Sequence, residues 1–245
     1  MGKIILRILG SAAALLLLLL FMPLFLIAVI IVALDSPGPI IFKQKRVGFN
    51  GRKFVLYKLR TMRKNANGDY PFHTQVKDPR FSRICRIIRA TAIDEIPQLW
   101  NIIKGDMTFI GPRPELPKVV ATYTAEQKNI LKFRPGLLGI SQLVLREGVK
   151  YQKKLKIENA YYPKRNMLKD IFIFTMTPIV LCDHALGQFL PFFPHRTEYV
   201  NTLWFKWLVV KNGDGALYEI TEETGQKTQS KIDEKVHTQF MEQRN

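Results

Sequence analysis

The sequence predicts a mixed fold of helices and short strands, held at a membrane by a re-entrant N-terminal helix. Three observations support this prediction. First, 27 consecutive uncharged residues, from Ile8 to Leu34, exceed the ~20 that a helix needs to span a bilayer. Second, basic residues flank this apolar run on both sides. Third, short alternating stretches and helical periodicities follow it along the chain, as in a folded body.

The apolar run has three interpretations. A cleaved signal peptide is disfavoured, because its apolar core usually spans only about 7 to 15 residues and because Val32-Ala33-Leu34 makes a poor cleavage site. Pro23 divides the run into 15 residues before it and 11 after it. Since proline removes a backbone donor and kinks a helix, a straight span is the second interpretation and a helix bent at Pro23 is the favoured one.

The flanking charges favour the bent helix over the straight span, which stays open. Lys3 and Arg7 precede the run, and beyond Asp35 nine basic residues follow it with no acidic residue among them: Lys43, Lys45, Arg46, Arg52, Lys53, Lys58, Arg60, Arg63 and Lys64. Lys and Arg near a membrane segment favour the cytoplasmic side. A helix that enters the membrane, bends and returns to the same face satisfies both flanks. Residues 1–35 are therefore predicted to be a re-entrant membrane helix.

The net charge of +17 predicts a polyanionic partner, which is nucleic acid, an acidic lipid surface or a phosphorylated substrate. Residues 1–210 hold 32 basic and 13 acidic side chains, a net charge of +19, whereas residues 211–245 carry −2. The charge thus belongs to the membrane-proximal body. Because no nucleic-acid-binding motif is present and a membrane segment is, we expect no nucleic acid partner.

The first elements after the membrane helix follow a turn at Ser36-Pro37-Gly38-Pro39. Residues 40–42 and 53–59, separated by Gly48-Phe49-Asn50-Gly51, predict a β-hairpin. Residues 65–77 read as a loop. Residues 81–89 predict a helix, in which arginines recur every three positions with isoleucines beside them. This helix either lies against lipid headgroups or simply presents a solvated basic face, and both interpretations stay open.

The remaining elements are predicted by caps and apolar runs. A helix over 98–104 is capped by Gly105, a strand follows at 107–110, and helices are expected at 124–133 and 152–162. The apolar stretch 167–181 is short of a full span and is interrupted by Pro178, which predicts a buried or interfacial helix. Residues 190–210 are aromatic and favour a core or a membrane interface, and a polar, solvated end begins near residue 221.

The chemistry is concentrated around Asp94 and Glu95. Pro97 places the start of a helix close to these two residues, because proline is tolerated only in the first turn. Carboxylates at a helix start gain from its dipole, so both are expected to stay ionised near neutral pH. Such a pair can supply a nucleophile and a ligand for Mg²⁺. Alternatively, the pair only stabilises the helix.

Cations accompany this acidic pair. Phosphoryl-transfer sites commonly combine carboxylates, a divalent metal and arginines that bind two oxygens at once. Arg113, between two prolines, has a stiff backbone that suits docking of a phosphate or a base, with plain packing as the alternative. The basic residues that we predict to bind substrate are Lys58, Arg60, Arg89, Arg113 and Arg134. Other catalytic sets have little support, because the histidines are scattered, the two cysteines form no CxxC motif and no P-loop is present.

Three ordered blocks of the sequence resemble one family. They are Ser36 to Gly48 with Tyr57 to Met62, Asp94 to Asp106 with Gly111 to Pro114, and Arg134 to Gln142. The chain resembles the bacterial sugar transferases, the monotopic polyprenyl-phosphate phosphoglycosyl transferases that initiate surface-glycan assembly. The resemblance runs from about residue 3 to about residue 182, and it implies a catalytic domain at 36–182 followed by an extension of unknown role at 183–245.

The resemblance implies a membrane-embedded α+β domain on the cytoplasmic face of the bacterial inner membrane. It implies transfer of a sugar phosphate from a nucleotide diphosphate sugar, commonly a UDP-sugar, to a polyprenyl phosphate. By the same resemblance Asp94 is the nucleophile that forms a covalent phosphosugar intermediate, and Glu95 helps to hold Mg²⁺. Lys58 and Arg89 match basic positions of the family's active site, and Arg113 matches its Pro-Arg-Pro turn.

The sequence also departs from the family. Met22 precedes Pro23 where the family often has a serine, and Glu158 shifts the acid that normally stands before the Tyr161-Tyr162 pair, so this acid receives no role at this stage. The alternative to an enzyme is a catalytically inactive, membrane-anchored interaction protein on the same fold. Membrane lipids are expected partners in either case, and association into a homodimer is left open.

Overall fold

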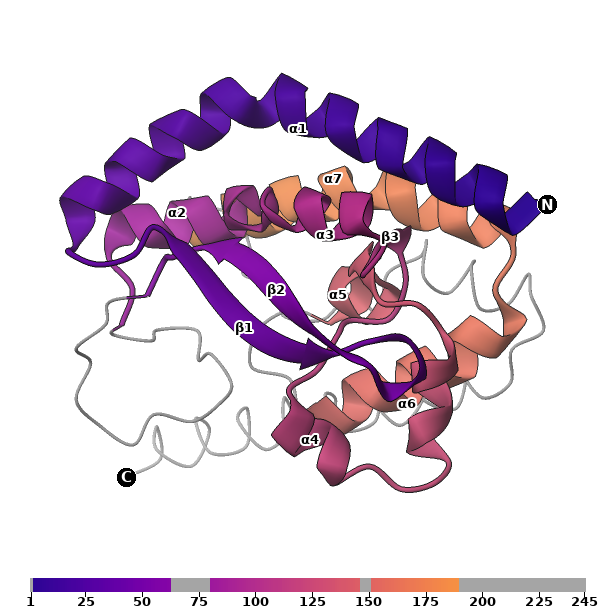
Figure 1. Ribbon diagram of the computed structural model, residues 1–245. Coiled ribbons are helices and arrows are strands. Elements are labelled where there is room, and N and C mark those ends of the chain that lie inside the picture. Colours follow the sequence, from indigo (N-terminus) through magenta and orange to yellow (C-terminus); the bar gives the residue numbers. More distant parts are fainter. Residues whose placement is uncertain (1, 63–79, 146–150, 190–245) are drawn as a thin grey trace, which may run out of the picture. The chain divides into compact units, whose positions relative to one another are not determined.

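The computed structural model describes residues 2–62, 80–145 and 151–189 (Figure 1). All of these residues lie in one unit of the chain, Met1–Thr197. The loop predicted at 65–77, the aromatic stretch at 190–210 and the polar end from residue 221 lie outside the described residues, as does most of the predicted extension at 183–245.

The chain begins with one long helix, α1 (Gly2–Asp35), which has 34 residues and contains Pro23. Figure 1 shows α1 as a bent arch, as expected where proline removes a backbone donor. By length and composition its segment Ile4–Asp35 could cross a membrane, and only 11% of its most apolar window is buried. A core helix of a soluble protein would be mostly buried, so α1 is suited to anchor the protein in a membrane.

The predicted hairpin is confirmed. Strand β1 (Ile41–Val47) pairs antiparallel with β2 (Lys53–Leu59), and the register runs from Ile41 opposite Leu59 to Val47 opposite Lys53. A short 3₁₀ turn, η1 (Phe49–Gly51), joins the two strands, and its Asn50 and Gly51 have φ values of 52° and 77°. Asparagine and glycine tolerate this left-handed backbone, which explains why the connection forms at this sequence.

Two helices follow the hairpin and surround the acidic pair. Helix α2 (Arg83–Ala90) begins after Ser82, whose side chain accepts a hydrogen bond from the Cys85 N–H. Helix α3 (Gln98–Lys104) ends at Gly105, which has a φ of 81°. The predicted limits of α3 and its glycine cap are confirmed, because both are set by local residues.

A second, parallel pair of strands lies beyond α3. Strand β3 (Thr108–Ile110) was predicted, but its partner β4 (Gly136–Leu138) was not. The backbones of Gly111 and Gly136 approach so closely here that a Cβ on Gly136 would overlap the backbone nitrogen of Gly111. Glycine is therefore required by space at this crossing.

The connection between these strands corrects one prediction. Instead of a helix over 124–133, the chain forms α4 (Pro117–Ala121) and a six-residue 3₁₀ helix, η3 (Gln127–Lys132). The 3₁₀ helix ends before Pro135, which disfavours helical backbone in the residue that precedes it. A short helix, α5 (Ile140–Val144), follows β4 and was also not predicted.

The last described elements are α6 (Tyr151–Tyr161), η4 (Tyr162–Lys164) and α7 (Met167–Phe189). The prediction that Pro178 interrupts α7 was wrong, because the helix continues through Pro178. The hydroxyl of Thr177 donates to the Ile173 carbonyl at 2.6 Å, so side chains supply hydrogen bonds in the turn that proline weakens.

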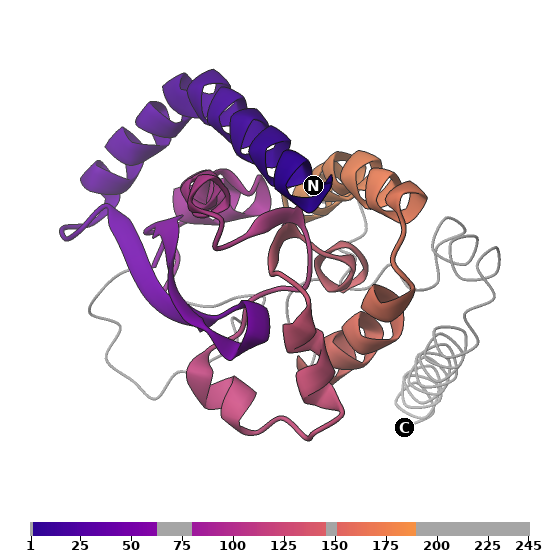
Figure 2. The same ribbon diagram turned by 45° about the vertical axis from the view of Figure 1, so that its right-hand side comes forward.

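One part of the core lies between α1 and the hairpin, with α2 and α3 between them, and another is formed by buried residues of α5, α6 and α7 (Figures 1 and 2). The two halves of α1, before and after Pro23, each have their own buried contacts. Ala14 packs in one cluster with residues of β2 and α3, and Ala28 and Val32 pack in a second cluster with Leu59 of β2 and residues of α2. Burial on both sides of Pro23 ties the bent helix to the elements that carry the acidic pair.

Candidate active site

The acidic pair occupies its own short turn. Asp94 and Glu95 belong to η2 (Ile93–Glu95), a 3₁₀ turn that precedes α3, so they lie upstream of the helix rather than in its first turn. Pro97 is the N-cap of α3, and Ala92 enters the turn with a φ of 57°. Asp94 is only 3% exposed. The strained left-handed residue and the proline therefore fix the turn that holds both carboxylates.

The hairpin delivers Lys58 to the acidic pair. The Lys58 Nζ lies 2.5 Å from the Glu95 Oε1 and 3.8 Å from the Asp94 Oδ2. The fully buried Asn101 of α3 fixes this geometry, since it donates to the Val55 carbonyl at 2.7 Å and accepts from the Tyr57 N–H at 3.2 Å. Asn101 thus fastens α3 to β2 next to the lysine, a role that the sequence did not reveal.

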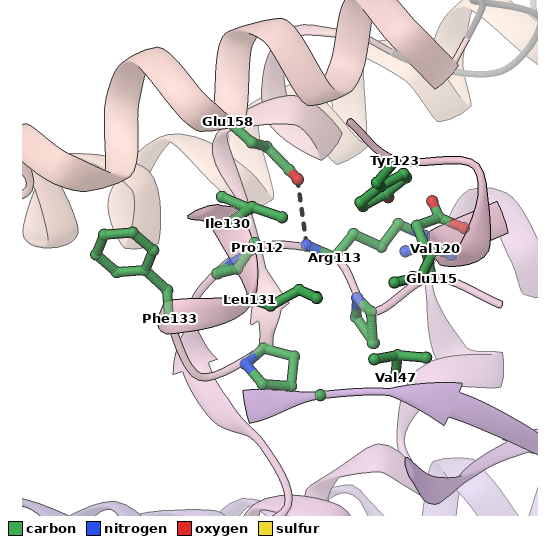
Figure 3. A pocket seen from close by; sticks show the side chains of 13 residues that line it. Val47, Pro112, Arg113, Glu115, Val120, Tyr123, Ile130, Leu131, Phe133 and Glu158 are labelled. Atoms are coloured by element: carbon green, nitrogen blue, oxygen red, sulfur yellow. Dashed lines mark hydrogen bonds between the residues drawn. The ribbon is translucent and has the colours of Figure 1, made fainter. Parts of the chain in front are cut away.

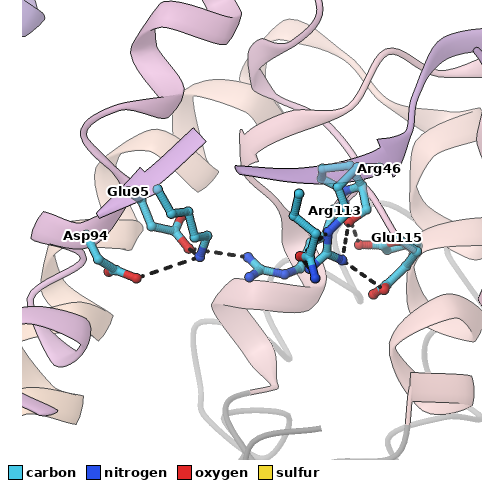
Figure 4. A network of polar contacts seen from close by, with 9 residues as sticks. Arg46, Asp94, Glu95, Arg113 and Glu115 are labelled. Atoms are coloured by element: carbon cyan, nitrogen blue, oxygen red, sulfur yellow. Dashed lines mark hydrogen bonds and ion pairs between the residues drawn. The ribbon is translucent and has the colours of Figure 1, made fainter. Parts of the chain in front are cut away.

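Arg113 reaches the same pair from the Pro-Arg-Pro turn. Its guanidinium lies 3.6 Å from the Glu95 Oε1. Figure 4 shows it between the acidic pair and a second ion pair, in which Arg46 lies 3.4 Å from Glu115. Arg46 also donates to the Pro114 carbonyl at 3.1 Å. Arg46 and Glu115 were not predicted, although both stand inside or beside blocks that carry the family resemblance.

Arg89 completes the group from the last turn of α2, where its guanidinium lies 4.6 Å from the centre of the Phe81 ring. Its charge lowers the pKa values of both Asp94 and Glu95. The structure therefore brings together five of the predicted residues: Lys58, Arg89, Asp94, Glu95 and Arg113.

The other two predicted substrate-binding residues have structural contacts. Arg60 is 6% exposed and donates to the carbonyls of Val32, Ser36 and Pro37, where α1 ends. A cation there satisfies free carbonyls and complements the negative end of the helix. Arg134 donates to the Gly105 carbonyl at 2.5 Å and lies 5.5 Å from the centre of the Phe49 ring. These contacts give both arginines a structural role in the frame of the site, and their contact with substrate stays a prediction.

The pKa values of the two carboxyls in the acidic pair are shifted in opposite directions. Burial raises the pKa of Asp94 to about 6, against the opposing effect of Lys58. Burial would also raise the pKa of Glu95, but Lys58 and Arg113 outweigh it and lower this pKa to about 2. Glu95 is thus a permanent anion, and Asp94 is mostly ionised at pH 7. The cations therefore favour the ionised form of Glu95, whereas burial works against the expected ionisation of Asp94.

The acidic pair fits Mg²⁺ only in company with substrate. Among the described residues, no group of three or more His, Cys, Asp or Glu side chains is placed to hold a metal. Mg²⁺ commonly takes one or two protein carboxylates and completes its shell with water and substrate phosphate oxygens. Glu95, which stays anionic beside Lys58 and Arg113, fits this requirement.

A small pocket adjoins the Pro-Arg-Pro turn (Figure 3). Its lining is mostly apolar, with Arg113, Glu115 and Glu158 as charged members. The Glu158 Oε1 accepts hydrogen bonds from the Arg113 N–H at 3.2 Å and from the Ser141 hydroxyl at 2.5 Å. Burial raises the pKa of Glu158 to about 7. Sequence analysis had given this acid no role.

Comparison with known proteins identifies the family. The model of the family described as "Bacterial sugar transferase" matches residues 1–184. The chain belongs to the bacterial sugar transferase family. The resemblance that three blocks of sequence indicated is thereby confirmed, and the match covers every described element except the last residues of α7.

Named relatives are similar to this sugar transferase over part of their length. The UDP-glucose:undecaprenyl-phosphate glucose-1-phosphate transferase of Caulobacter vibrioides is 41% identical over 56% of this chain and 52% of its own. The UDP-N-acetylgalactosamine-undecaprenyl-phosphate N-acetylgalactosaminephosphotransferase of Aeromonas hydrophila is 37% identical over 63% and 37%. The exopolysaccharide production protein ExoY of Sinorhizobium fredii is 31% identical over 74% and 87%. The chain thus spans about half or less of the first two relatives and most of the third.

Proposed function

We propose that this sugar transferase moves a sugar phosphate from a nucleotide diphosphate sugar, most simply a UDP-sugar, to a polyprenyl phosphate, as the first membrane step of a surface polysaccharide. The observation that carries the proposal is the buried Asp94 carboxylate, ionised at neutral pH and surrounded by Lys58, Arg89 and Arg113. The names of two relatives, which specify an undecaprenyl phosphate and a UDP-sugar, support it.

The reaction divides into two displacements. In the first, an Asp94 oxygen attacks the phosphorus that bears the sugar, and the bond from this phosphorus to the bridging oxygen breaks, so that a nucleoside monophosphate leaves. In the second, a phosphate oxygen of the polyprenyl phosphate attacks the same phosphorus. The bond to Asp94 breaks, the carboxylate is restored, and a polyprenyl diphosphosugar is released. A covalent step of this kind replaces one difficult displacement by two easier ones.

The cations of the site oppose the repulsion between these anions. Carboxylate, diphosphate and lipid phosphate are all negative, so their approach needs fixed positive charge. Lys58 and Arg113, which bind Glu95 in the structure, lie within reach of an incoming diphosphate. Bidentate contact suits Arg113 and Arg89, whereas Lys58 acts as a compact charge beside the nucleophile.

Glu95 is the residue that would hold Mg²⁺, which supplies further charge neutralisation when bound together with donor phosphates. Glu95→Gln keeps the size of the side chain and removes its charge. We expect this variant to need a Mg²⁺ concentration about tenfold or more above that of the wild type for half-maximal adduct formation, since the loss of even an outer-shell partner of a metal ligand costs about 10–100-fold in affinity. An unchanged Mg²⁺ requirement would remove Glu95 from the metal site.

The membrane helix accounts for the lipid substrate. We propose that α1 is re-entrant, with both ends on the cytoplasmic face of the bacterial inner membrane, so that the polyprenyl chain stays in the bilayer while its phosphate reaches the site. The bend in α1 and its exposed apolar side chains support this (Figure 1). Exposed Ile84 and Ile87 of α2 lie beside exposed arginines, which favours contact with headgroups.

Mass spectrometry tests the covalent step. The protein in lipid nanodiscs is incubated with Mg²⁺ and a panel of UDP-sugars, without lipid acceptor. We expect an added phosphosugar mass on the peptide that contains Asp94, lost in Asp94→Asn and retained in Asp170→Asn, where the altered carboxylate pairs with Arg165 away from the site. If no sugar nucleotide gives an adduct, the alternative of an inactive interaction protein is favoured.

Cysteine labelling tests the topology. In a Cys182→Ser background, which removes the exposed free thiol, Lys3→Cys and Lys43→Cys should react with an impermeant reagent from the same side of the membrane. Labelling from opposite sides would mean that α1 is a straight span. Association of two copies stays a prediction that cross-linking of the same variants can test.

A further inference from the structure

We propose that Glu158 is a positioning residue, which holds the Pro112-Arg113-Pro114 turn so that the Arg113 guanidinium faces the acidic pair. The inference rests on the proposed function, because it assigns Glu158 to the binding of the donor through Arg113. In this role its carboxyl group acts on the donor through the turn and not by touching a reacting atom.

The turn has a single backbone donor. Proline has no N–H, so among residues 112–114 only Arg113 can donate from the main chain. That N–H donates to the Glu158 Oε1 at 3.2 Å. The carbonyls on either side are bound from elsewhere, Pro112 by the Gly136 N–H at 3.0 Å and Pro114 by Arg46 at 3.1 Å. Glu158 therefore supplies the acceptor for the turn's one N–H.

Glu158 is itself held in place. It belongs to α6, is 5% exposed, and accepts at the same oxygen from the Ser141 hydroxyl of α5 at 2.5 Å. A buried carboxyl is costly in an apolar pocket, and an apolar side chain would avoid that cost. Stability of the pocket alone therefore does not account for an acid at this position, whereas fixing the N–H of a two-proline turn does.

The two ends of Arg113 connect Glu158 to the chemistry. Its N–H points to Glu158 (Figure 3), and its guanidinium extends to 3.6 Å from the Glu95 Oε1 (Figure 4). The guanidinium is carried on a flexible side chain, so its reach depends on where the turn holds its backbone. A misplacement of about 1 Å in a binding group can cost about a hundredfold in rate.

Two variants of nearly equal size separate positioning from packing. Glu158→Gln keeps an oxygen that can accept from the Arg113 N–H, whereas Glu158→Met fills the same space without an acceptor. The measurement is the rate of Asp94 adduct formation against UDP-sugar concentration, with full-length protein in nanodiscs and Mg²⁺. We expect the half-saturating donor concentration of Glu158→Met to exceed that of Glu158→Gln by about tenfold, the usual effect of leaving one buried donor unpaired.

The kinetic parameter that changes distinguishes a positioning role of Glu158 from a purely structural one. A purely structural role lowers the fraction of folded enzyme, which reduces the maximal rate and leaves the half-saturating concentration unchanged. Equal half-saturating concentrations for the two variants would overturn the proposal. If Glu158→Met yields no folded protein, Glu158→Asp replaces it, since its carboxyl is one methylene too short to reach the same N–H, and the same comparison with Glu158→Gln decides.

A double-mutant cycle with Arg113→Ala tests whether Glu158 acts through Arg113. Without the guanidinium, Glu158→Met should cause less than about twofold further change, and additive losses would contradict the inference. Glu126→Met, at an exposed glutamate of the neighbouring segment, is the control. Failure of the wild type to form any adduct would refute the proposed function, whereas adduct formation that ignores Glu158 would refute this inference alone.

Discussion

Removal of Lys58 should change the charge of the nucleophile as well as the binding of substrate. The Lys58 Nζ lies 3.8 Å from the Asp94 Oδ2, and both side chains are largely buried, so little solvent screens this pair. Lys58→Met keeps most of the length and volume of the side chain and removes its charge. Lys58→Arg keeps a positive charge and is the matched control.

The magnitude follows from the distance. An opposite charge within about 4 to 6 Å lowers the pKa of a carboxyl by ~1–3 units. Without Lys58 the pKa of Asp94 should therefore rise from about 6 to roughly 7–9. A higher pKa means that the carboxyl is protonated at neutral pH and cannot attack. The ionised fraction at pH 7 should fall from about 90% to between about 50% and about 1%, a loss of roughly two- to ninetyfold.

The assay is the pH dependence of adduct formation at low donor concentration, measured from pH 5 to pH 9.5. This dependence reports the pKa of the free enzyme's essential groups. The wild type should lose activity below about pH 6, and Lys58→Met should lose it at a pH at least about one unit higher, with recovery in alkali. If Lys58→Met is slower by the same factor at every pH, Lys58 binds substrate but does not hold the charge of Asp94.

Three further predictions concern stability, each measured as a thermal unfolding temperature in nanodiscs. The pKa of Asp94 is about 6 in the folded protein and 3.8 in the unfolded chain, so its ionisation lowers the stability of the fold as the pH rises through this range. Asp94→Asn should therefore be more stable than the wild type at pH 8, by up to about 3 kcal/mol. This difference should shrink as the pH falls towards 4. Arg60→Met should lower the unfolding temperature by several degrees, because carbonyls at the end of α1 lose their hydrogen-bond donors. The half-saturating concentration of the UDP-sugar should stay unchanged. A higher requirement for the UDP-sugar would support the predicted role of Arg60 in substrate binding. Gly136→Ala should prevent folding, because its Cβ would overlap the Gly111 backbone. Gly10→Ala is the control and should fold normally, because a Cβ at this position has no atom within 4 Å. A folded Gly136→Ala variant would mean that strands β3 and β4 can separate.

The exact bounds of α3 and β2 were predicted from residues in or next to these elements. Helix α3 begins after Pro97 and ends at Gly105, and β2 covers Lys53–Leu59 as expected. Proline and glycine restrict or permit backbone angles by themselves, so their effect is visible without tertiary structure. The long helix α1 was equally clear, since 27 uncharged residues have few other stable arrangements.

Two parts of the fold that depend on contacts made after folding, β4 and the middle of α7, were not predicted from the sequence. Strand β4 has three residues and gains its structure from β3, more than 20 positions earlier in the chain, so no local pattern identified it. Pro178 was expected to interrupt α7, but hydroxyl-to-carbonyl hydrogen bonds such as that of Thr177 accompany an unbroken helix. In both cases contacts made after folding outweighed local preference.

The sequence by itself determined the family, the apolar anchor and the residue types of the site, because composition and ordered motifs are properties of the chain. Only the tertiary structure decided which of the seven predicted site residues meet. It joined Lys58 and Arg113 to the acidic pair, turned Arg60 and Arg134 to backbone carbonyls, and gave Glu158 a partner. The physical reason is that charge and hydrogen bonding act over a few ångströms in space, whereas these residues lie tens of positions apart in the chain.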